Sequence, residues 1–472
     1  MNVYSPKAYT IPGVDAMQAA ITPPLHLAPL HLAPVGAKAV ALDFDGGRLS
    51  SDAGLVLLKD PDEHLGLTHS LAAVLSDPRD PRRVHFTHHD LLKQRVLHIA
   101  AGYEDANDAN TLRHDPIFKL LLDRLPETGA PLASQPTLSR FENRVSRTEL
   151  YRMALVLVEQ FLAAYVRPPQ LIVLDFDDTE DPVHGEQDQA RYDGYYGGYC
   201  FLPLHLYEGL SGRLITTIFK AKRFTGAQML AVLTRLVKRL RHAWPHTLLI
   251  FRGDSHFAYP EVMQWIEEQP DLSYVTGLTS NRVLTELARE VVEQAKRAYE
   301  RDGGKITRFH STRYQAGTWS RWRRVVIKVE GCDQGVNTRF VVTDMEHART
   351  KGLYQQIYCA RGQAENDIKD HKRYLKSDRT SCHRFEANQF RLFLHSAAYV
   401  LLDTLRREVL QTTPWASATM ETIQLRLLKL GARVQECTER IKISLPSSCL
   451  VAPVLRRSLT LLACVRLTEQ AL

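Results

Sequence analysis

Apolar and polar residues follow two different rhythms along the chain, and the rhythm changes near residue 170. Before that point apolar residues recur at helical spacing, as in the segment that Thr87 can cap and Gly102 can end. Residues 171–177 are instead mostly apolar, which is typical of a buried strand. The same reasoning predicts strands at 201–208, 214–220, 247–251, 323–330 and 338–343, helices at 227–243, 388–411 and 417–433, and then a short strand and a last helix.

The order of the elements after residue 170 predicts the fold class. Three strands, a helix and a further strand follow one another, which is the order of an RNase H-like α/β core. The long segment after these strands ends in alternating strands and predicts a β-rich insertion that interrupts the core. The expected units are a flexible arm (1–38), a helical DNA-binding region (39–168), the catalytic core (169–258 and 352–411), the insertion (259–351) and a helical C-terminal region (412–472).

Two N-terminal segments differ in what they predict. Residues 1–38 are rich in proline and small residues and repeat the pentapeptide Leu-His-Leu-Ala-Pro at 25–29 and 30–34, which predicts an extended, poorly ordered arm. Residues 135–144 predict a capped helix in which Arg140 and Arg144 are candidates for DNA contact. This helix is either a recognition helix or a surface helix of a bundle, because no helix-turn-helix spacing is clean.

The composition is that of a globular protein with a mild preference for polyanions. The chain has 472 residues, of which 44% are hydrophobic, with a formal net charge of +7 and a pI near 8.9. Its seven cysteines include no C-x-x-C pair, so neither a zinc site nor a disulfide framework is predicted. The N-terminus lacks a signal-peptide pattern, and no uncharged apolar run reaches membrane-spanning length. We expect a soluble protein of a reducing cytoplasm.

Acidic residues lie at the ends of two predicted strands. Alternation places Asp175 and Asp177 on one face of their strand, so both can approach one metal ion. Acidic side chains on an otherwise apolar strand are costly to bury unless they are paired or bind cations. Asp254 follows the strand at 247–251, where side chains enter the crevice of α/β folds, although a lone aspartate there is also a common turn residue.

A predicted helix carries another acidic residue beside phosphate-binding side chains. The face begins at Tyr358 and continues three, seven and fourteen residues later with Arg361, Glu365 and Lys372. In an α-helix these four side chains lie within roughly 60° of one another. This face combines a carboxylate for a metal with groups that bind phosphate oxygens, and Lys369 is a further cation on the same helix. The alternative is a solvated charged face.

Carboxylates from separate elements suit phosphodiester chemistry. Two divalent ions about 4 Å apart can activate the attacking oxygen and stabilise the leaving one. Oxygen ligands favour Mg²⁺ or Mn²⁺. Two such ions are therefore the expected cofactors.

The spacing of Tyr358, Arg361, Glu365 and Lys372 resembles the Y-R-E-K signature of bacterial insertion-sequence DDE transposases. Segments 45–49, 102–108, 132–137 and 195–199 resemble the insertion-sequence family numbered thirteen-eighty, and together they run over most of the chain. The resemblance implies the catalytic and metal-binding residues Asp177, Asp254 and Glu365, with Asp175 as a rival for the first position and a supporting ligand. It also implies that Tyr358, Arg361 and Lys372 hold phosphates of the transposon end.

The predicted insertion carries a basic and aromatic cluster. Trp319 and Trp322 lie among arginines, and similar enzymes use an aromatic residue of the insertion to receive a flipped base. We therefore expect these tryptophans to contact DNA. The alternative is that they fill a sheet face, as tryptophans in strands commonly do.

Other functions fit parts of the sequence. The segment 174–179 also resembles the D-x-D-x-T motif of haloacid-dehalogenase-like phosphatases, with Asp175 as the nucleophile. The later acidic pair of such phosphatases is missing, because Ala258 stands where the second acid is needed. A catalytically silent DNA-binding protein and a nuclease without joining activity are further alternatives.

The prediction is a cut-and-paste DNA transposase. It would bind the terminal repeats of an insertion sequence, cleave the ends by two-metal-ion hydrolysis and join the 3′-hydroxyls to target DNA. Because two ends must be held together, a dimer is expected on double-stranded DNA. The resemblance implies a bacterial cytoplasm and association with the nucleoid.

Overall fold

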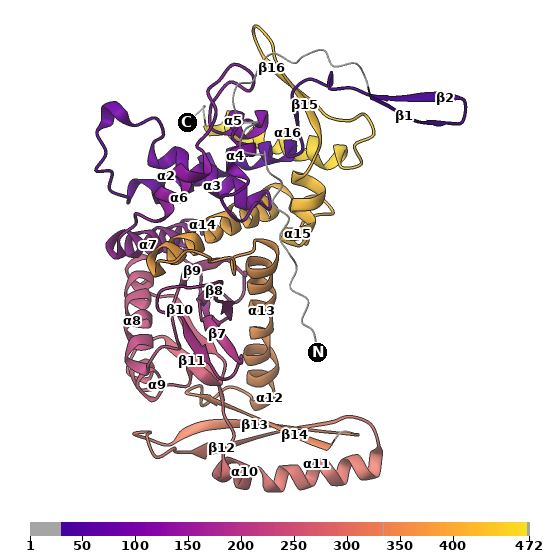
Figure 1. Cartoon of the computed structure of the whole chain (residues 1–472). Helices are drawn as coiled ribbons and strands as arrows, with labels where there is room; N and C mark the ends of the chain where they lie inside the picture. Colours follow the sequence, from indigo (N-terminus) through magenta and orange to yellow (C-terminus); the bar gives the residue numbers. More distant parts are fainter. Residues whose placement is uncertain (1–29, 334, 470–472) are drawn as a thin grey trace, which may run out of the picture.

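The computed structural model describes residues 30–333 and 335–469, and a mixed sheet of eight strands lies at its centre (Figure 1). The middle of this sheet has the order β9-β8-β4-β10-β11. These strands are β4 (Leu171–Asp178), β8 (Leu204–Glu208), β9 (Leu214–Ile218), β10 (Leu248–Gly253) and β11 (Leu272–Leu278). β10 is parallel to β4 and β11, whereas β8 is antiparallel to β4 and β9. The chain order 3-2-1-4-5 agrees with the predicted RNase H-like α/β core.

Helices cover both faces of this sheet. α8 (Gly226–Ala243) and α9 (Pro260–Glu267) pack on one face, where Leu233 and Val262 share an apolar core with Phe176. Thr225 begins α8 with a capping box, since its hydroxyl accepts from the N–H of Gln228. α12 (Thr350–Gly352) and α13 (Gly362–Lys369) belong to a helical run along the other face (Figure 1). Both faces of the strands are therefore buried, as their apolar sequence predicts.

The expected insertion continues the core sheet. β12 (Ile306–Tyr314), β13 (Arg323–Cys332) and β14 (Gly335–Thr343) form an antiparallel set, and β14 pairs with β11 from Val275↔Thr343 to Leu278↔Phe340. α10 (Arg282–Leu287) precedes α11 (Arg289–Asp302), which packs on β12 and β13. The predicted start at residue 259 is too early, because α9 and β11 pack within the core and the added strands begin only after them.

The N-terminal and C-terminal helices share one apolar core. The N-terminal helices are α1 (Lys59–Leu65), α2 (Leu67–Ala73), α3 (His88–Ala100), α4 (Ala109–Leu112), α5 (Pro116–Leu121), α6 (Gln135–Glu142) and α7 (Arg147–Ala163). Thr87 caps α3, as predicted, and Asp90 completes a capping box with it. α14 (Phe385–Thr404) is buried on almost every side and contacts α3, α6 and α7. Residues 39–168 and the C-terminal helices therefore fold together rather than as separate bodies.

The C-terminal segment ends in a small sheet and a helix. α15 (Met420–Ile423) continues as a helical segment to Leu428, and the predicted helix at 417–433 therefore ends early. β15 (Ala432–Glu436) follows and pairs with β16 (Ile441–Ser444) and with β3 (Leu49–Ser50) from the N-terminal part. α16 (Ala452–Glu469) ends the described chain.

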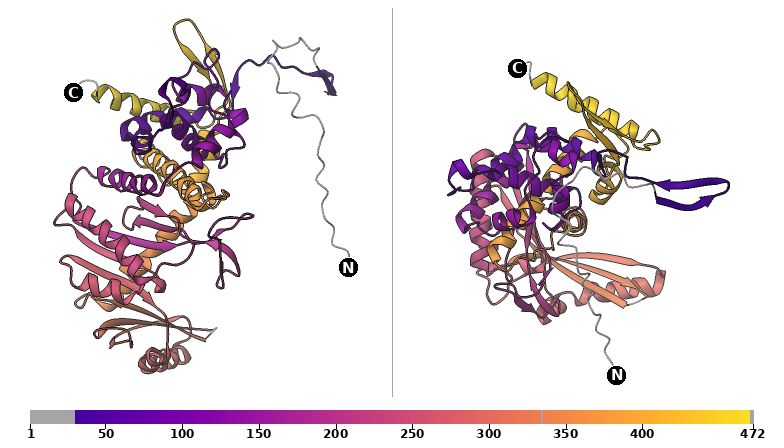
Figure 2. Two further views of the ribbon diagram at one scale, coloured as in Figure 1. Left: turned by 60° about the vertical axis from the view of Figure 1, so that its left-hand side comes forward. Right: turned by 45° about the horizontal axis from the view of Figure 1, so that its top comes forward.

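The predicted arm is described only in its last residues. The first copy of the pentapeptide repeat lies outside the described residues, and the second lies in β1 (Leu30–Val35). β1 pairs with β2 (Lys38–Leu42) in an exposed hairpin that projects from the molecule (Figure 2). Among the described residues, no helix combines the length and apolar character needed to cross a membrane.

Candidate active site

Asp177 lies at the end of β4, on the edge of the sheet where the parallel strands end. One of its oxygens accepts from Nη1 of Arg361 at 3.0 Å. Burial raises the pKa of Asp177 from its usual 3.8 to about 7, while Arg361 opposes the rise and the nearby charge of Asp254 adds to it. A buried carboxylate with one cationic contact retains free lone pairs for another cation.

Asp254 reaches the same edge from the neighbouring strand. It directly follows β10, which is parallel to β4, so the two aspartates leave adjacent strand ends. Its Oδ1 accepts from the backbone N–H of His256 at 2.8 Å, and its Oδ2 lies 3.0 Å from Nδ1 of that histidine. These contacts hold the carboxylate at the beginning of a short turn.

Glu365 approaches from the helical run across the edge. Nη2 of Arg361 donates to its Oε1 at 3.0 Å, so one guanidinium lies between Glu365 and Asp177. The Glu365 side chain is exposed, whereas Asp177 is mostly buried. The structure therefore gathers the three predicted acids around Arg361, at the edge where β4 and β10 end.

The helical run that carries Glu365 is irregular. Residues 353–358 and 370–374 have π-helical hydrogen bonding, residues 359–361 are 3₁₀, and only 362–369 are regular α-helix. The single α-helical face predicted from spacing is therefore wrong in geometry. Arg361 and Glu365 nevertheless face Asp177, and Nζ of Lys372 donates to the backbone oxygen of Glu180, just beyond β4. π-Helical turns often occur at functional sites.

Gly277 makes room for Tyr358 at this site, and no sequence pattern predicted this contact. A Cβ built on Gly277 would lie 2.8 Å from the Tyr358 hydroxyl and 2.8 Å from the backbone nitrogen of Ser255. Burial raises the pKa of Tyr358, and the charge of Asp254 adds to the rise. The phenol therefore lies beside the strand end that carries Asp254.

Asp175 does not belong to the carboxylate cluster, although we predicted it as a supporting metal ligand. Its two oxygens accept from Nε and Nη2 of Arg252 at 2.5 and 2.6 Å, and both side chains are buried. Arg252 lies directly opposite Asp175 on β10, and its Nη1 donates to the backbone oxygen of Ile357 at 2.6 Å. This ion pair anchors the helical run next to Tyr358. It also excludes Asp175 as a phosphatase nucleophile, because no substrate could reach it.

The remaining predicted DNA contacts include two exposed side chains and one that is held within the protein. Arg140 and Lys369 are exposed. Arg144 instead lies 2.8 Å from Nε2 of His88 and donates to the backbone oxygen of Ser76 at 2.8 Å, so it joins α6 to neighbouring segments. We correct the prediction for Arg144 to a structural role.

The two tryptophans lie in the loop that precedes β13. Trp319 is buried against Tyr314 and beneath Arg323, so it fills the core. β13 runs in the same direction as β11, and Arg324 near its start is level with Val275 in the middle of β11, as the pairs Arg324↔Thr343 and Val275↔Thr343 show. Trp322 is exposed and directly precedes β13. The burial of Trp319 contradicts its predicted role in receiving a flipped base, whereas the role of Trp322 stays a prediction.

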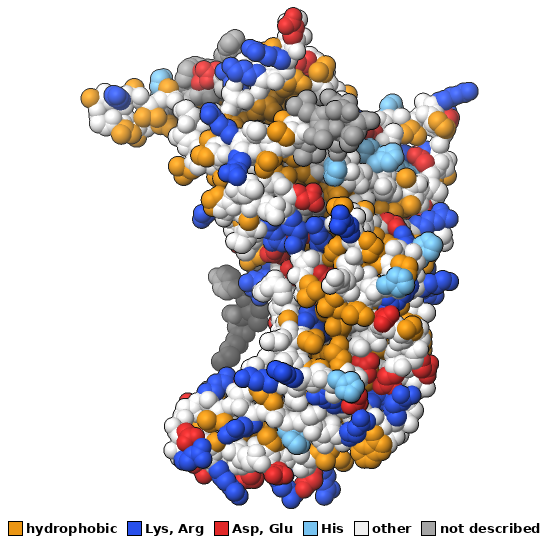
Figure 3. All heavy atoms as spheres, turned by 180° about the vertical axis from the view of Figure 1, so that it is seen from behind, with side chains coloured by type: hydrophobic (Ala, Val, Ile, Leu, Met, Phe, Trp, Pro, Cys, Tyr) orange, Lys and Arg blue, Asp and Glu red, His pale blue; other side chains and the backbone are white. Residues whose placement is uncertain are grey.

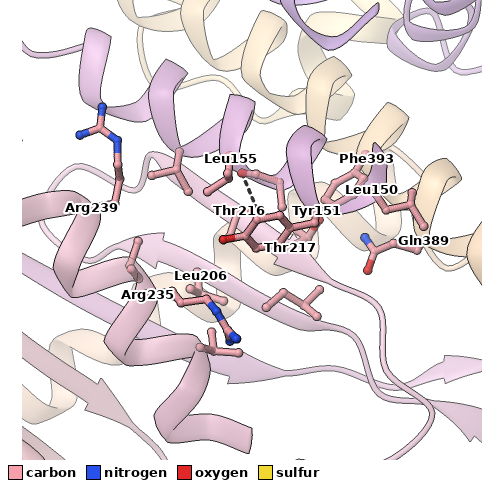
Figure 4. Close-up of a pocket in the computed structure, with 15 residues that line it drawn as sticks. Leu150, Tyr151, Leu155, Leu206, Thr216, Thr217, Arg235, Arg239, Gln389 and Phe393 are labelled. Carbon is pink, nitrogen blue, oxygen red and sulfur yellow. Dashed lines mark hydrogen bonds between the residues drawn. The ribbon is translucent and has the colours of Figure 1, made fainter. Parts of the chain in front are cut away.

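An apolar cavity lies elsewhere in the molecule. It has a volume of about 250 Å³ and is lined by α7, α8, β8, β9 and α14, with Leu206 and Phe393 on its walls (Figure 4). Arg235 and Arg239 are the charged residues that line it (Figure 4). It contains none of the clustered acids.

The carboxylates suit a hard divalent cation. Within 30–333 and 335–469, no three His, Cys, Asp or Glu side chains are already close enough to hold a metal ion. The side-chain groups that accept hydrogen bonds from Arg361 are the carboxylates of Asp177 and Glu365. Mg²⁺ and Mn²⁺ prefer such oxygen ligands. Asp177 and Glu365 each present a carboxylate oxygen to Arg361, and Asp254 leaves the adjacent strand end, so the residues present fit such an ion in their chemistry.

The wider surface is hollowed beside this core. Seen from behind, the molecule is concave between its upper helical part and the strands β12–β14 with α11, and Lys and Arg side chains gather along the hollow (Figure 3).

A comparison with protein families decides the classification. Residues 32–467 match the family model described as "Transposase DDE domain group 1". The chain belongs to this DDE transposase family. No curated protein matches the chain. Among solved structures, one similar chain comes from a cryo-EM structure of a piggyBac transposase synaptic complex with hairpin DNA. It is 12% identical, the match covers 79% of this chain and 80% of that one, and the TM-score is 0.41. A TM-score this low supports no transfer of residue roles, so the roles assigned to residues of this chain depend on the geometry of this structure alone.

Proposed function

We propose that the protein cleaves the ends of an insertion sequence and joins the freed 3′-hydroxyls to target DNA. The observation that carries the proposal is the convergence of Asp177, Asp254 and Glu365 around one arginine, in a chain of the DDE transposase family. The Y-R-E-K resemblance to the insertion-sequence family numbered thirteen-eighty supports the same reading. Double-stranded terminal repeats are the proposed first substrate, and the basic hollow of Figure 3 is the proposed path for DNA.

Each residue of the site has a separate proposed role in the cleavage of a phosphodiester. Asp177, Asp254 and Glu365 would hold two divalent ions, Mg²⁺ or Mn²⁺. When bound, these ions supply activation of the attacking oxygen and stabilisation of the leaving one. Arg361 releases its contacts with the acids and binds phosphate oxygens, a contact that suits its planar guanidinium. Tyr358 and Lys372 orient the strand on either side, and Lys369 and Arg140 add phosphate contacts farther away.

The proposal is tested by cleavage of a labelled duplex that carries the element's own terminal repeats. The parent protein with Mg²⁺ or Mn²⁺ should cut the duplex, and Glu365→Gln should bind it without cutting. Glu290→Gln is the matched control, because this exposed glutamate lies on α11, the helix that packs on β12 and β13, and its replacement should leave cutting unchanged. Binding without cutting by the parent would instead support a silent DNA-binding protein.

A further inference from the structure

A tyrosine-rich ribbon lies beside the carboxylate site and has no role in the function described above. It comprises residues 181–201, in which β5 (Asp181–Pro182), β7 (Gly198–Phe201) and β6 (Arg191–Asp193) pair in the order β5-β7-β6. The ribbon projects from the core (Figure 2). Tyr192, Tyr195 and Tyr199 are 63%, 78% and 63% exposed. Exposed aromatic side chains forgo the stabilisation that burial would give. A group of three on one short segment therefore indicates an interaction surface.

The base of the ribbon is fixed to the catalytic core. It begins four residues after Asp177, and its first residue, Asp181, accepts from the Thr380 hydroxyl. Nε2 of Gln187 donates to the backbone oxygens of Thr380 and Cys382 at 2.5 and 3.0 Å, just past the run that carries Glu365. The ribbon is thus connected to β4 through the chain and to residues 380–382 through hydrogen bonds.

The tip of the ribbon is ordered and points its rings outward. Oδ1 of Asp193 accepts from the backbone N–H of Tyr195 at 2.9 Å, and Gly197 closes the turn with φ +70°. Tyr192 and Tyr199 are paired across the strands with ring centroids 5.8 Å apart. Rings presented by an ordered turn lose little conformational entropy when they bind a partner.

Charged residues link the tip of the ribbon to the strand end that carries Asp177. Arg223 lies 6.0 Å from the Tyr195 ring. It belongs to the basic loop that follows β9, in which Lys222 is exposed. Lys220 of the same loop pairs with Asp178, the residue after Asp177, at 2.6 Å.

Charge indicates which part of a nucleic acid the ribbon suits. Residues 181–201 contain four acidic side chains and a single arginine, so the ribbon itself repels a phosphate backbone. Aromatic rings stack on unpaired bases regardless of sequence, at about 1–3 kcal/mol per base, and neighbouring cations hold the phosphates. The ribbon supplies the rings, and Lys222 with Arg223 supplies the cations.

We propose that the tyrosine ribbon binds unpaired bases of the DNA end held at Asp177, Asp254 and Glu365. This inference rests on the proposed function, because it needs a DNA end at the site. It gives the ribbon the base-stacking task that the sequence suggested for Trp319 and Trp322. The rings at Tyr192, Tyr195 and Tyr199 would keep the strands apart next to the bond that is cut.

The test compares two terminal-repeat duplexes in the Glu365→Gln background, which leaves the DNA intact. One is fully paired, and the other has three unpaired nucleotides beside the cleavage position, one of them the fluorescent base 2-aminopurine. The background protein should bind the unpaired duplex about tenfold more tightly and quench its fluorescence. Replacing all three tyrosines by alanine should abolish this preference while leaving affinity for the paired duplex unchanged. The matching phenylalanine variant should keep the preference.

Two controls separate stacking from structure. Tyr151→Ala removes an exposed tyrosine of α7 and should have no effect. Tyr195→Ala alone removes a ring whose recorded contacts are with Tyr196 and Arg223, so it tests the inference if the triple variant loses its fold. A preference that survives both Tyr195→Ala and the triple alanine variant would overturn the inference. A parent protein that neither binds nor cuts the paired repeats would overturn the proposed function itself.

Discussion

Two ion pairs on the same face of β4 stand two residues apart and differ in almost every physical respect. Asp175 and Arg252 have side chains that are 1% exposed, and both carboxylate oxygens are bound by the guanidinium. Asp177 and Arg361 are 14% and 18% exposed and share one contact of 3.0 Å, while the same arginine also binds Glu365. The inner pair is complete, whereas the outer pair retains capacity for further ligands.

The difference teaches how to separate a structural acid from a functional one. A buried ion pair is tolerated when its geometry is complete, and breaking it leaves an isolated buried charge. The outer acid lies at the sheet edge among like charges, which costs stability and suits cation binding. Five predictions test this contrast, from the largest expected effect to the smallest.

Asp175→Ala should lower the free energy of unfolding by about 3–5 kcal/mol, because it leaves Arg252 buried without a counter-charge. Chemical denaturation measures this loss. The comparison variant is Asp177→Ala, which should cost far less because Arg361 retains Glu365 and access to water. Equal destabilisation by the two variants would remove the distinction between the pairs.

Asp177→Asn should reduce end cleavage by about a thousandfold, since the site loses an anionic ligand for the proposed ions. DNA binding should remain, because contacts of Lys and Arg with phosphates supply much of the affinity. Single-turnover cleavage and a gel-shift titration measure the two properties. Cleavage at the parent rate would show that Asp177 is dispensable and that the contrast is misassigned.

Two glycines lie against the two ion pairs' surroundings. A Cβ on Gly209 would lie 2.3 Å from Nη2 of Arg252 and 2.5 Å from Oδ2 of Asp175, so Gly209→Ala should lower stability by about 1–3 kcal/mol. Gly277→Ala should displace both the Tyr358 hydroxyl and the backbone at Ser255, and slow cleavage by about tenfold. Thermal unfolding and cleavage rates, measured on both variants, should show the larger loss of cleavage for Gly277→Ala.

The metal concentration that cleavage requires should depend on pH through the protonation of Asp177. Asp177 has a pKa of about 7 in the folded chain against 3.8 usually, so it holds a proton below pH 7 and competes poorly for cations. The metal concentration for half-maximal cleavage should therefore be about tenfold higher at pH 6 than at pH 8.

The same shift has a consequence for stability. A raised carboxyl pKa destabilises the folded state fully above about pH 7, and this cost disappears below about pH 4. Asp177→Asn should therefore raise the melting temperature at pH 8 and leave it unchanged at pH 4. A higher melting temperature for the parent at pH 8 would contradict the sign of this shift.

Local pattern was enough to locate most elements of the core. The capping box at Thr87, the buried strand that carries Asp177 and the helix at 227–243 all appear where periodicity and turn chemistry predict them. These signals are local, because they depend on residues within one or two turns of each other. The predicted role of Trp319 failed for the opposite reason, because its burial depends on packing against Tyr314 of the neighbouring strand and against Arg323.

The sequence by itself determined that three acids leave separate core elements and that an arginine, a tyrosine and a lysine accompany the third. It could not rank Asp175 against Asp177, because both occupy the same face of one strand with the same neighbours in sequence. Only the tertiary structure places Arg252, from 77 residues away, directly opposite Asp175 and leaves Asp177 at the open edge. Long-range strand register decides which carboxylate is neutralised inside the protein and which is left to bind something else.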